Sequence, residues 1–553
     1  MNFSPKMNAA VLTAISSVFL VLAYNFRFWN EFSEAIGGLG WGNAPLHIAA
    51  FVILTLTFNA LLIVAALPRI MKPFLILLFL ATSLASHYMS AYGIVIDEAM
   101  MQAVFETDVR EATELLNWNV ALAVLLLGLL PSLVVWRIRL DFPPFRRGLL
   151  LHTGIAAVSL VLAAGLLLLF FKSIAPAFRE HRELRFLLAP TNYIYATRGY
   201  LKRKYGRPSV IASIGSDAAK GPLWQERPRK TAMVIVLGET ARAMNFSLNG
   251  YVRDTNPELA KQAGLINFAN VSACGTATAV SVPCVFSSLG RKNYSETAAK
   301  SQQGLLDVLD HAGFSVLWRD NNTGCKGTCD RVKFEDWSQP VAGDPLCTPE
   351  ECFDEHLLSG LPALMRSSKG DMVIVLHQKG SHGPAYWKRY PHRFGRWNPV
   401  CTTTSLEKCS RDSIIAAYDN TILYTDHFLS ETIDLLRMSE SEDGIDTALI
   451  YFSDHGESLG EMNLYLHGAP YVIAPEEQRR VPFMVWLSDG FRSRFQIDTK
   501  CLSARTQQAF SHDNVFHSAL GMLNVSTAVY NPALDIFQAC RRPGRAEAMR
   551  EDR

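Results

Sequence analysis

Long apolar runs fill the first third of the chain, whereas short apolar runs alternate with polar stretches in the rest. Five long runs can each cross about 30 Å of hydrocarbon as a helix, and none contains Lys, Arg, Asp or Glu. They are residues 7–24, 46–67, 73–93, 119–136 and 149–171. The first run could be a signal peptide, but no small-residue cleavage site follows it and four more runs do. The pattern therefore predicts an α-helical module of five transmembrane spans over residues 1–171.

Basic residues in the short loops set the orientation of these spans. Loop 137–147 carries four arginines against Asp141, and loop 68–72 carries Arg69 and Lys72, whereas loop 94–118 is acidic. Because short basic loops remain in the cytoplasm, the N-terminus is expected there. An odd number of spans then places everything after residue 171 on the outer side of the membrane.

All ten cysteines lie between Cys274 and Cys540, which supports the same orientation. Closely spaced cysteines in an even number are typical of disulfides in an oxidising compartment. The alternative is a zinc knuckle at Cys325 and Cys329, although no partner pair follows at finger spacing. Proximity alone suggests the pairs Cys274–Cys284, Cys325–Cys329, Cys347–Cys352 and Cys401–Cys409, leaving Cys501 and Cys540.

A basic segment joins the apolar module to the rest of the chain. Residues 172–230 interleave arginines and lysines with aromatic residues and leucines, which predicts amphipathic helices lying on the membrane surface. A solvated linker is the alternative. Pro222 and Pro228 mark the end of this segment, so the predicted divisions are 1–171, 172–230 and 231–553. With a net charge of only +2, the whole chain gives no sign of nucleic-acid binding.

From residue 231 onward the pattern is typical of an α/β domain. Short apolar runs that read as buried strands alternate with helical segments. The runs are residues 232–237, 314–318, 372–376, 448–452 and 482–487. In such sheets the ligand site lies beyond the carboxyl ends of the strands.

Three of these strands are followed directly by potential metal ligands. Glu239 follows the first, His382 stands in the loop after residues 372–376, and Asp454 and His455 follow residues 448–452. Oxygen and nitrogen ligands without thiolates suit a catalytic zinc with an open position for substrate. A single strand-end Asp-His pair could be a structural cap, but three strands with such residues favour a metal site.

Residues 273–284 supply a candidate nucleophile. Small residues, Thr276 and Thr278 stand between Cys274 and Cys284, which predicts a tight turn into a helix N-terminus suited to phosphate. Coordination to a metal would activate a threonine hydroxyl. The alternative is a Ser/Thr-rich loop held by a disulfide.

Taken together, these motifs closely resemble the lipid A phosphoethanolamine transferases of Gram-negative bacteria, within the alkaline phosphatase superfamily. The resemblance covers essentially the whole chain and implies a five-helix anchor joined to a periplasmic α/β zinc domain with a sulfatase-like sheet flanked by helices. It rests on the anchor and on residues 238–242, 274–278, 321–327, 380–384, 453–457 and 511–514.

The resemblance also implies roles for individual residues. Thr278 would be the nucleophile, and His382 and His467 would bind a second zinc or the incoming phosphate. Lys326 would contact the substrate phosphate. The tightly bound zinc would be held by Glu239, Thr278, Asp454 and His455.

One departure from the family concerns the loop after the third span. Thr107 and Glu111, expected to contact the donor lipid, are retained, but Ala103 stands where many relatives have Asn. The departure therefore concerns the loop expected to contact the donor lipid and leaves the zinc-site motifs unchanged.

The expected reaction is a ping-pong transfer of phosphoethanolamine from phosphatidylethanolamine to a lipid A phosphate through Thr278. The expected setting is a monomer in the inner membrane, with its catalytic domain in the periplasm. Less negative lipid A would bind cationic peptides such as polymyxin less strongly.

Other acceptors (Kdo or heptose of the core), or a phosphatase, sulfatase or phosphoglycerol transferase, remain open. A receptor or transporter is disfavoured because the spans lack Asp, Glu, Lys and Arg.

Overall fold

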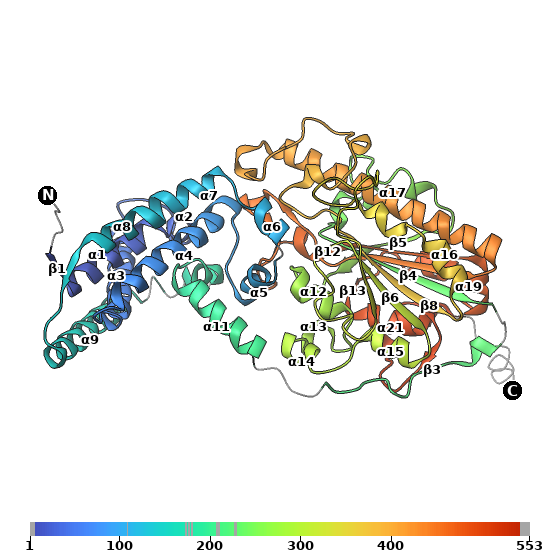
Figure 1. Cartoon of the computed structure of the whole chain (residues 1–553), viewed down its shortest axis with the longest axis horizontal. Coiled ribbons are helices and arrows are strands. Elements are labelled where there is room, and N and C mark those ends of the chain that lie inside the picture. Colours follow the sequence, from blue (N-terminus) through green and yellow to red (C-terminus); the bar gives the residue numbers. More distant parts are fainter. Residues whose placement is uncertain are drawn as a thin grey trace. The chain divides into compact units, whose positions relative to one another are not determined.

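The computed structural model describes residues 6–107, 109–171, 174, 177–178, 181–205, 211–225 and 229–541 of the chain (Figure 1). Two compact units result: Met1–Met101 with Ala112–Gly199, and Gln102–Glu111 with Tyr200–Arg553. The chain passes between them after Met101 and after Glu111, in the loop that follows the third predicted span, and after Gly199, inside the predicted connector. The division at residues 171 and 230 therefore stays a prediction.

The first unit is helical, and its described residues contain four helices long and apolar enough to cross a membrane. They are α3 (Ala44–Val64), α4 (Met71–Tyr92), the continuous α7, η1 and α8 (Trp118–Ala123, Val124–Leu129 and Leu130–Arg137), and α9 (Phe145–Leu169).

The first predicted span is shorter than expected. Helix α1 (Ala9–Ala23) has 15 residues and is followed, after a bend of 65°, by α2 (Phe26–Ala35). Polar residues such as Arg27, Asn30 and Glu31 in α2 explain why the apolar run stops there. The described residues therefore give four spans, or five if the bent pair crosses as one.

Short helices complete the region between and after the spans. They are α5 (Glu98–Glu106), α6 (Val109–Glu114), η2 (Arg182–Phe186) and α11 (Thr191–Tyr205). The last two lie in the predicted connector, whose residues 206–210 and 226–228 fall outside the described part. Its contact with a membrane surface stays a prediction.

The second unit is built on a mixed sheet of eight strands. Their order is β13 (Phe510–Ser511), β5 (Ile266–Ser272), β12 (Arg480–Leu487), β9 (Asp446–Ser453), β4 (Thr231–Gly238), β8 (Met372–His377), β6 (Ser315–Asp320) and β7 (Lys333–Asp336). Strand β12 runs antiparallel to β5 and β9, and the remaining pairs are parallel. All five predicted strands are present.

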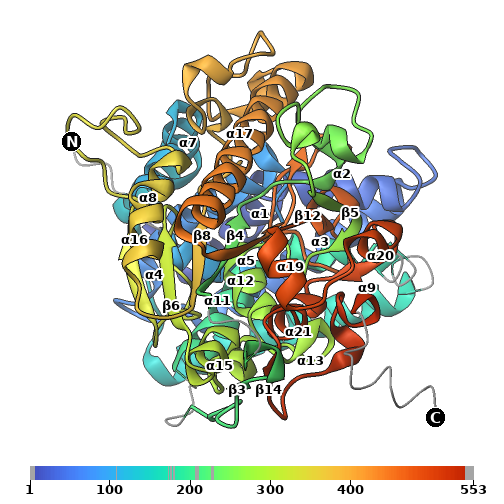
Figure 2. The same cartoon turned by 90° about the vertical axis from the view of Figure 1, so that its right-hand side faces the viewer.

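Helices cover both faces of this sheet. Helices α16 (Leu361–Ser367) and α17 (Arg411–Asp443) lie on one face, and α12 (Thr278–Val285), α15 (Leu305–His311) and α21 (Asp513–Met522) lie on the other, as Figures 1 and 2 show. Strands β4, β8 and β9 are buried along their whole length. Covering on both faces explains why they read as continuous apolar runs rather than as alternating ones.

Smaller elements fill the edges of the unit. They are the hairpin β10 (Ser458–Leu459) and β11 (Tyr465–Leu466), the pair β3 (Ala219–Lys220) and β14 (Val525–Ser526), and helices α13 (Gly290–Asn293), α14 (Glu296–Lys300), α18 (Glu476–Arg479), α19 (Asp489–Arg494) and α20 (Thr499–Ala504).

Five disulfides join neighbouring segments of the second unit. They are Cys274–Cys284, Cys325–Cys329, Cys347–Cys352, Cys401–Cys409 and Cys501–Cys540. Because Cys325 and Cys329 are bonded to each other, their sulfurs are not free thiolates for a zinc knuckle. The bond between Cys274 and Cys284 closes the loop that contains Thr278.

Candidate active site

Adjacent parallel strands deliver the acidic and imidazole side chains to one edge of the sheet. Gly238 at the end of β4 pairs with Ser453 at the end of β9, so Glu239 and Asp454 leave neighbouring strands side by side. On the other flank of β4, Leu237 pairs with His377, the last residue of β8. The register thus brings the ends of three strands together, as their sequence positions predicted.

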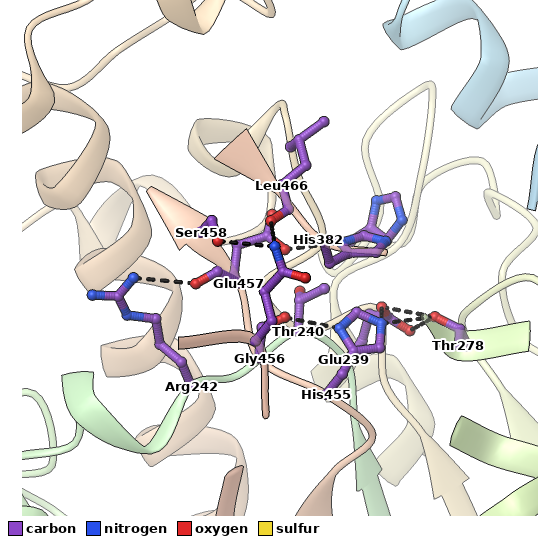
Figure 3. A network of polar contacts seen from close by, with 12 residues as sticks. Glu239, Thr240, Arg242, Thr278, His382, His455, Gly456, Glu457, Ser458 and Leu466 are labelled. Atoms are coloured by element: carbon purple, nitrogen blue, oxygen red, sulfur yellow. Dashed lines mark hydrogen bonds and ion pairs between the residues drawn. The ribbon is translucent and has the colours of Figure 1, made fainter. Parts of the chain in front are cut away.

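Thr278 is the first residue of α12, so the predicted helix start at this position is confirmed. Its Oγ1 lies 3.1 Å from each carboxylate oxygen of Glu239 and 3.2 Å from Nε2 of His455. Figure 3 shows the three side chains pointing toward one another. The threonine hydroxyl therefore meets a carboxylate and an imidazole at the N-terminus of a helix, where the helix dipole favours negative charge.

Asp454 completes a first group of potential metal ligands, which we call the inner cluster: Glu239, Asp454 and His455. All three residues are fully buried. Asp454 Oδ2 lies 3.3 Å from His455 Nε2, and Glu239 Oε1 lies 3.4 Å from the same nitrogen. His455 Nδ1 lies 2.9 Å from the Gly456 carbonyl, which can only accept, so Nδ1 carries the proton and Nε2 offers its lone pair to the cluster.

Burial shifts the titration of these groups. It raises the pKa of the Asp454 carboxyl to about 6. Burial, followed by the nearby His467, lowers the pKa of the His455 imidazole well below its usual value. Both shifts express the cost of placing charge in a buried site.

Close backbone packing holds Glu239 in place. Gly380 has φ of +54°, and a Cβ there would lie 2.7 Å from the Glu239 carbonyl oxygen and 2.9 Å from its nitrogen. Ser381 then donates its backbone N–H to the Glu239 carbonyl at 3.0 Å. The loop after β8 can therefore lie directly against Glu239 only because residue 380 is glycine.

A second group of ligands, the outer cluster, shares Glu239 with the inner one and adds His382 and His467. The rings of His382 and His467 are 5.7 Å apart, and that of His467 is 4.4 Å from His455. His467 Nδ1 lies 2.8 Å from Glu457 Oε2, which orients its Nε2 away from that carboxylate. The two histidines come from separate loops, after β8 and after β11.

Comparison with known proteins identifies the family of the chain. A family model described as "Phosphoethanolamine transferase EptA/EptB" matches residues 54–205, and one described as "Sulfatase" matches residues 231–525. Phosphoethanolamine transferase EptA of Escherichia coli K12 is 38% identical over 97% of this chain and 98% of its own length. The chain belongs to the phosphoethanolamine transferase family.

Further relatives agree with this assignment. Phosphatidylethanolamine transferase Mcr-1 of Escherichia coli is 37% identical over 93% of this chain and 95% of its own. The solved structure of the integral membrane lipooligosaccharide phosphoethanolamine transferase A from Neisseria meningitidis matches with a TM-score of 0.93. It is 33% identical and covers 98% of this chain and 100% of its own, so the family likeness includes both units.

The inner cluster of this family member fits a bound divalent metal. Asp454 Oδ2 is buried and accepts no hydrogen bond from any residue that the structure describes. Two buried carboxylates and an imidazole lone pair converge within 4.8 Å of one another. Buried carboxylates are costly unless paired or bound to a cation, and this donor set of oxygen and nitrogen suits zinc.

Several supporting residues were not assigned roles from the sequence. Asn322, which follows β6, donates from Nδ2 to Glu239 Oε2 at 2.8 Å. Tyr386 donates its hydroxyl to Glu457 Oε1 at 2.5 Å, opposite the bond to His467. The fully buried Asp354 accepts the N–H groups of Lys379 and Gly380 at 2.8 and 3.0 Å. Asn322 stands within residues 321–327, on which the family resemblance rests, whereas Tyr386 and Asp354 lie outside the segments that carry it.

The remaining predicted residues lie elsewhere. Lys326 donates from Nζ to the hydroxyl and carbonyl of Thr323 at 2.8 and 3.0 Å and lines a cavity of about 480 Å³. Thr107 donates its hydroxyl to the Ala103 carbonyl within its own helical turn at 2.5 Å. The side chain of Glu111 lies outside the described residues. Contacts of these three residues with substrate therefore stay predictions.

Proposed function

We propose that this protein transfers phosphoethanolamine from phosphatidylethanolamine to a phosphate of lipid A through a covalent intermediate on Thr278. The observation that carries the proposal is the threonine hydroxyl within 3.2 Å of both a carboxylate and an imidazole of a buried cluster. The names of the relatives support the transferred group and the lipid acceptor.

The first half-reaction uses this geometry directly. Glu239 accepts the hydroxyl hydrogen of Thr278, which leaves the oxygen as a nucleophile facing the donor phosphorus. A bond forms between Thr278 Oγ1 and phosphorus while the bond to the diacylglycerol oxygen breaks, and diacylglycerol leaves with the proton that Glu239 had accepted. The N-terminus of α12 favours the negative charge that gathers on the phosphoryl oxygens.

In the second half-reaction an oxygen of the lipid A phosphate attacks the same phosphorus. The bond to Thr278 breaks, its oxygen regains a proton, and modified lipid A is released. Zinc held by Glu239, Thr278, Asp454 and His455 would lower the pKa of the hydroxyl and neutralise phosphoryl charge. His382 and His467, with their donor nitrogens near Glu239, are placed to bind a second zinc or the incoming phosphate.

The cellular setting follows from the same proposal. Five spans with a cytoplasmic N-terminus put the catalytic unit in the periplasm, on the side of the membrane where both lipid substrates are reached. The protein acts there as a monomer. The disulfides are consistent with that oxidising space. Masking a lipid A phosphate with an ethanolamine group removes negative charge from the surface, so cells should become less sensitive to polymyxin.

The test is the mass of lipid A from a host without a transferase of its own, expressing wild type or Thr278→Ala. Wild type should add one phosphoethanolamine group to a lipid A phosphate, and Thr278→Ala should add none at equal membrane abundance. Thr278→Ser, which keeps a hydroxyl, should retain part of the activity.

Other outcomes would change the assignment. Loss of a phosphate would indicate a phosphatase. Addition to a core sugar would favour the reaction named for a 28% identical relative, Kdo(2)-lipid A phosphoethanolamine 7''-transferase of Escherichia coli K12. Full activity of Thr278→Ala would rule out the covalent route.

A further inference from the structure

A cavity of about 480 Å³ lies in the second unit, apart from the two ligand clusters. Its volume is within the range of about 300–1,000 Å³ that is typical of small-molecule sites. Its lining includes three cationic side chains (Lys300, Lys326 and Arg331), two carboxylates (Glu106 and Asp330) and the amides of Gln302 and Gln303. Such a lining suits a ligand with hydroxyl groups and a negative charge.

Two elements connect this cavity to the reacting hydroxyl. Helix α12 begins at Thr278, and Pro283 near its end lines the cavity, about 8 Å further along the helix axis. The loop after β6 places Asn322 on Glu239 and then supplies Lys326 and its neighbours to the cavity wall. The cavity wall and the reacting hydroxyl thus share one helix and one loop.

The charged groups of the wall are held in fixed positions. Arg331 makes two hydrogen bonds to Asp307, of 2.5 and 2.7 Å, and Lys300 is paired with Glu296. Lys326 has φ of +52°, a conformation that is uncommon for a residue with a Cβ and that clusters at functional sites. Fixed cations lose little conformational entropy when an anionic ligand binds.

A membrane-linked segment closes one side of the cavity. Glu106 lines it, and the buried Gln102 donates from Nε2 to both Glu106 and Glu296, at 3.2 and 3.1 Å. The segment 102–111 belongs to the second unit although apolar helices α4 and α7 stand on either side of it in the chain. Because this part of the cavity wall comes from a segment between two membrane-spanning helices of the chain, the cavity suits a ligand that is itself attached to the membrane.

The chemistry of the two substrates distinguishes between them. In phosphatidylethanolamine the atoms about 8 Å from the phosphorus, on the side away from ethanolamine, belong to the apolar acyl chains, which a charged lining disfavours. In the acceptor, the atoms at that distance belong to a phosphorylated sugar. Building on the proposed function, we propose that this cavity binds the phosphosugar head of the acceptor glycolipid.

Substitutions at α14 test this with a matched control. Ala299 lines the cavity, whereas its neighbour Ala298 in the same helix does not, and both are half-buried. In the purified full-length protein, Ala299→Glu should lower transfer to lipid A at least about tenfold through a higher KM, because it adds a like charge facing the ligand. Ala299→Gln should have a smaller effect, and Ala298→Glu should stay within about twofold of wild type.

Diacylglycerol release from phosphatidylethanolamine without acceptor separates the two half-reactions. It should stay within about twofold of wild type in Ala299→Glu, which also shows that the variant is folded. Thr328→Tyr, which adds a bulky side chain at another lining residue, should give the same pattern. A parallel loss of release and transfer would assign the cavity to the donor or to folding, and wild-type transfer in both variants would overturn the proposal.

A direct binding measurement tests the cavity proposal independently of the proposed function. Isothermal titration of wild type with glucosamine 6-phosphate should detect binding that Ala299→Glu weakens about tenfold and Ala298→Glu leaves unchanged. Glycerophosphoethanolamine binding should be equal in all three. Equal binding of the sugar phosphate to all three would overturn the cavity proposal, whereas absence of diacylglycerol release by wild type would overturn the proposed function alone.

Discussion

The inner and outer clusters share Glu239 but differ in exposure and in the backbone that carries them. Asp454 and His455 are 0% exposed and follow directly from a buried strand. His382 is 8% exposed, and the side chain of His467 is 19% exposed. From this difference we expect the inner cluster to hold a metal tightly and the outer cluster to be the part of the site that substrate reaches.

The backbone explains why the two clusters differ. Asp454 and His455 are fixed by the β4–β9 ladder, with Gly238 paired to Ser453. His467 instead follows a loop in which Met462, Asn463 and Leu466 all have positive φ. Non-glycine residues in this region cost about 1–3 kcal/mol each, so the loop depends on its surroundings to keep its shape.

The largest expected effects come from the inner cluster. Asp454→Asn or His455→Ala should reduce transfer at least about a thousandfold, because each removes a proposed metal ligand from a fully buried cluster. His467→Ala should reduce transfer only about ten- to a hundredfold. Equal losses in a lipid A transfer assay would contradict the distinction between the clusters.

Metal content should show the same order. After dialysis, wild type and His467→Ala should each keep a single equivalent of zinc, and Asp454→Asn should keep none. Stripping wild type with a chelator should abolish transfer and lower Tm, and added zinc should restore both. Elemental analysis of the dialysed proteins is the measurement. Zinc retention by Asp454→Asn would show that the metal lies elsewhere.

Substitution of Glu457, which holds the ring of His467 in position, tests the role of the outer cluster. Glu457→Gln weakens the bond to His467 Nδ1, so transfer should fall about tenfold while the zinc of the inner cluster remains. Tyr386→Phe removes the hydrogen bond of 2.5 Å to the other carboxylate oxygen of Glu457, and it should also lower transfer, but by less. Loss of the tightly bound zinc in Glu457→Gln would contradict this separation.

The smallest expected effect on activity comes from Asp354, which supports the loop before His382. Asp354→Asn replaces an acceptor of two backbone N–H groups, and should cost about 1–3 kcal/mol of stability. Transfer at low temperature should fall only a few-fold, with zinc retained. Chemical denaturation and the transfer assay measure the two effects. A larger loss of activity than of stability would mean that Asp354 acts on the site itself.

Much of the site could be predicted because strand ends follow from apolar runs. Continuous runs such as residues 232–237 identify strands buried on both faces, and the next residues then identify the functional edge. Strands β5 and β7 were missed for physical reasons. Strand β5 contains Asn267 and Asn270, and the edge strand β7 (K-F-E-D) is largely exposed, so neither carries an apolar run.

Support residues were harder to predict because their partners are distant in sequence. Asn322 reaches Glu239 across 83 positions, and Tyr386 reaches Glu457 across 71. Nothing local to either residue indicates such a contact. Helix α1 ends at Ala23, one residue before the predicted end at Tyr24, whereas the bend into the polar helix α2 was not predicted.

The most direct measurement is the mass of the peptide that contains Thr278. Purified full-length protein would be incubated with phosphatidylethanolamine in the absence of acceptor and quenched during the first turnover. The account predicts that this peptide gains one phosphoethanolamine group, which disappears when lipid A is added. Diacylglycerol release in the same sample with Thr278 unmodified would contradict it.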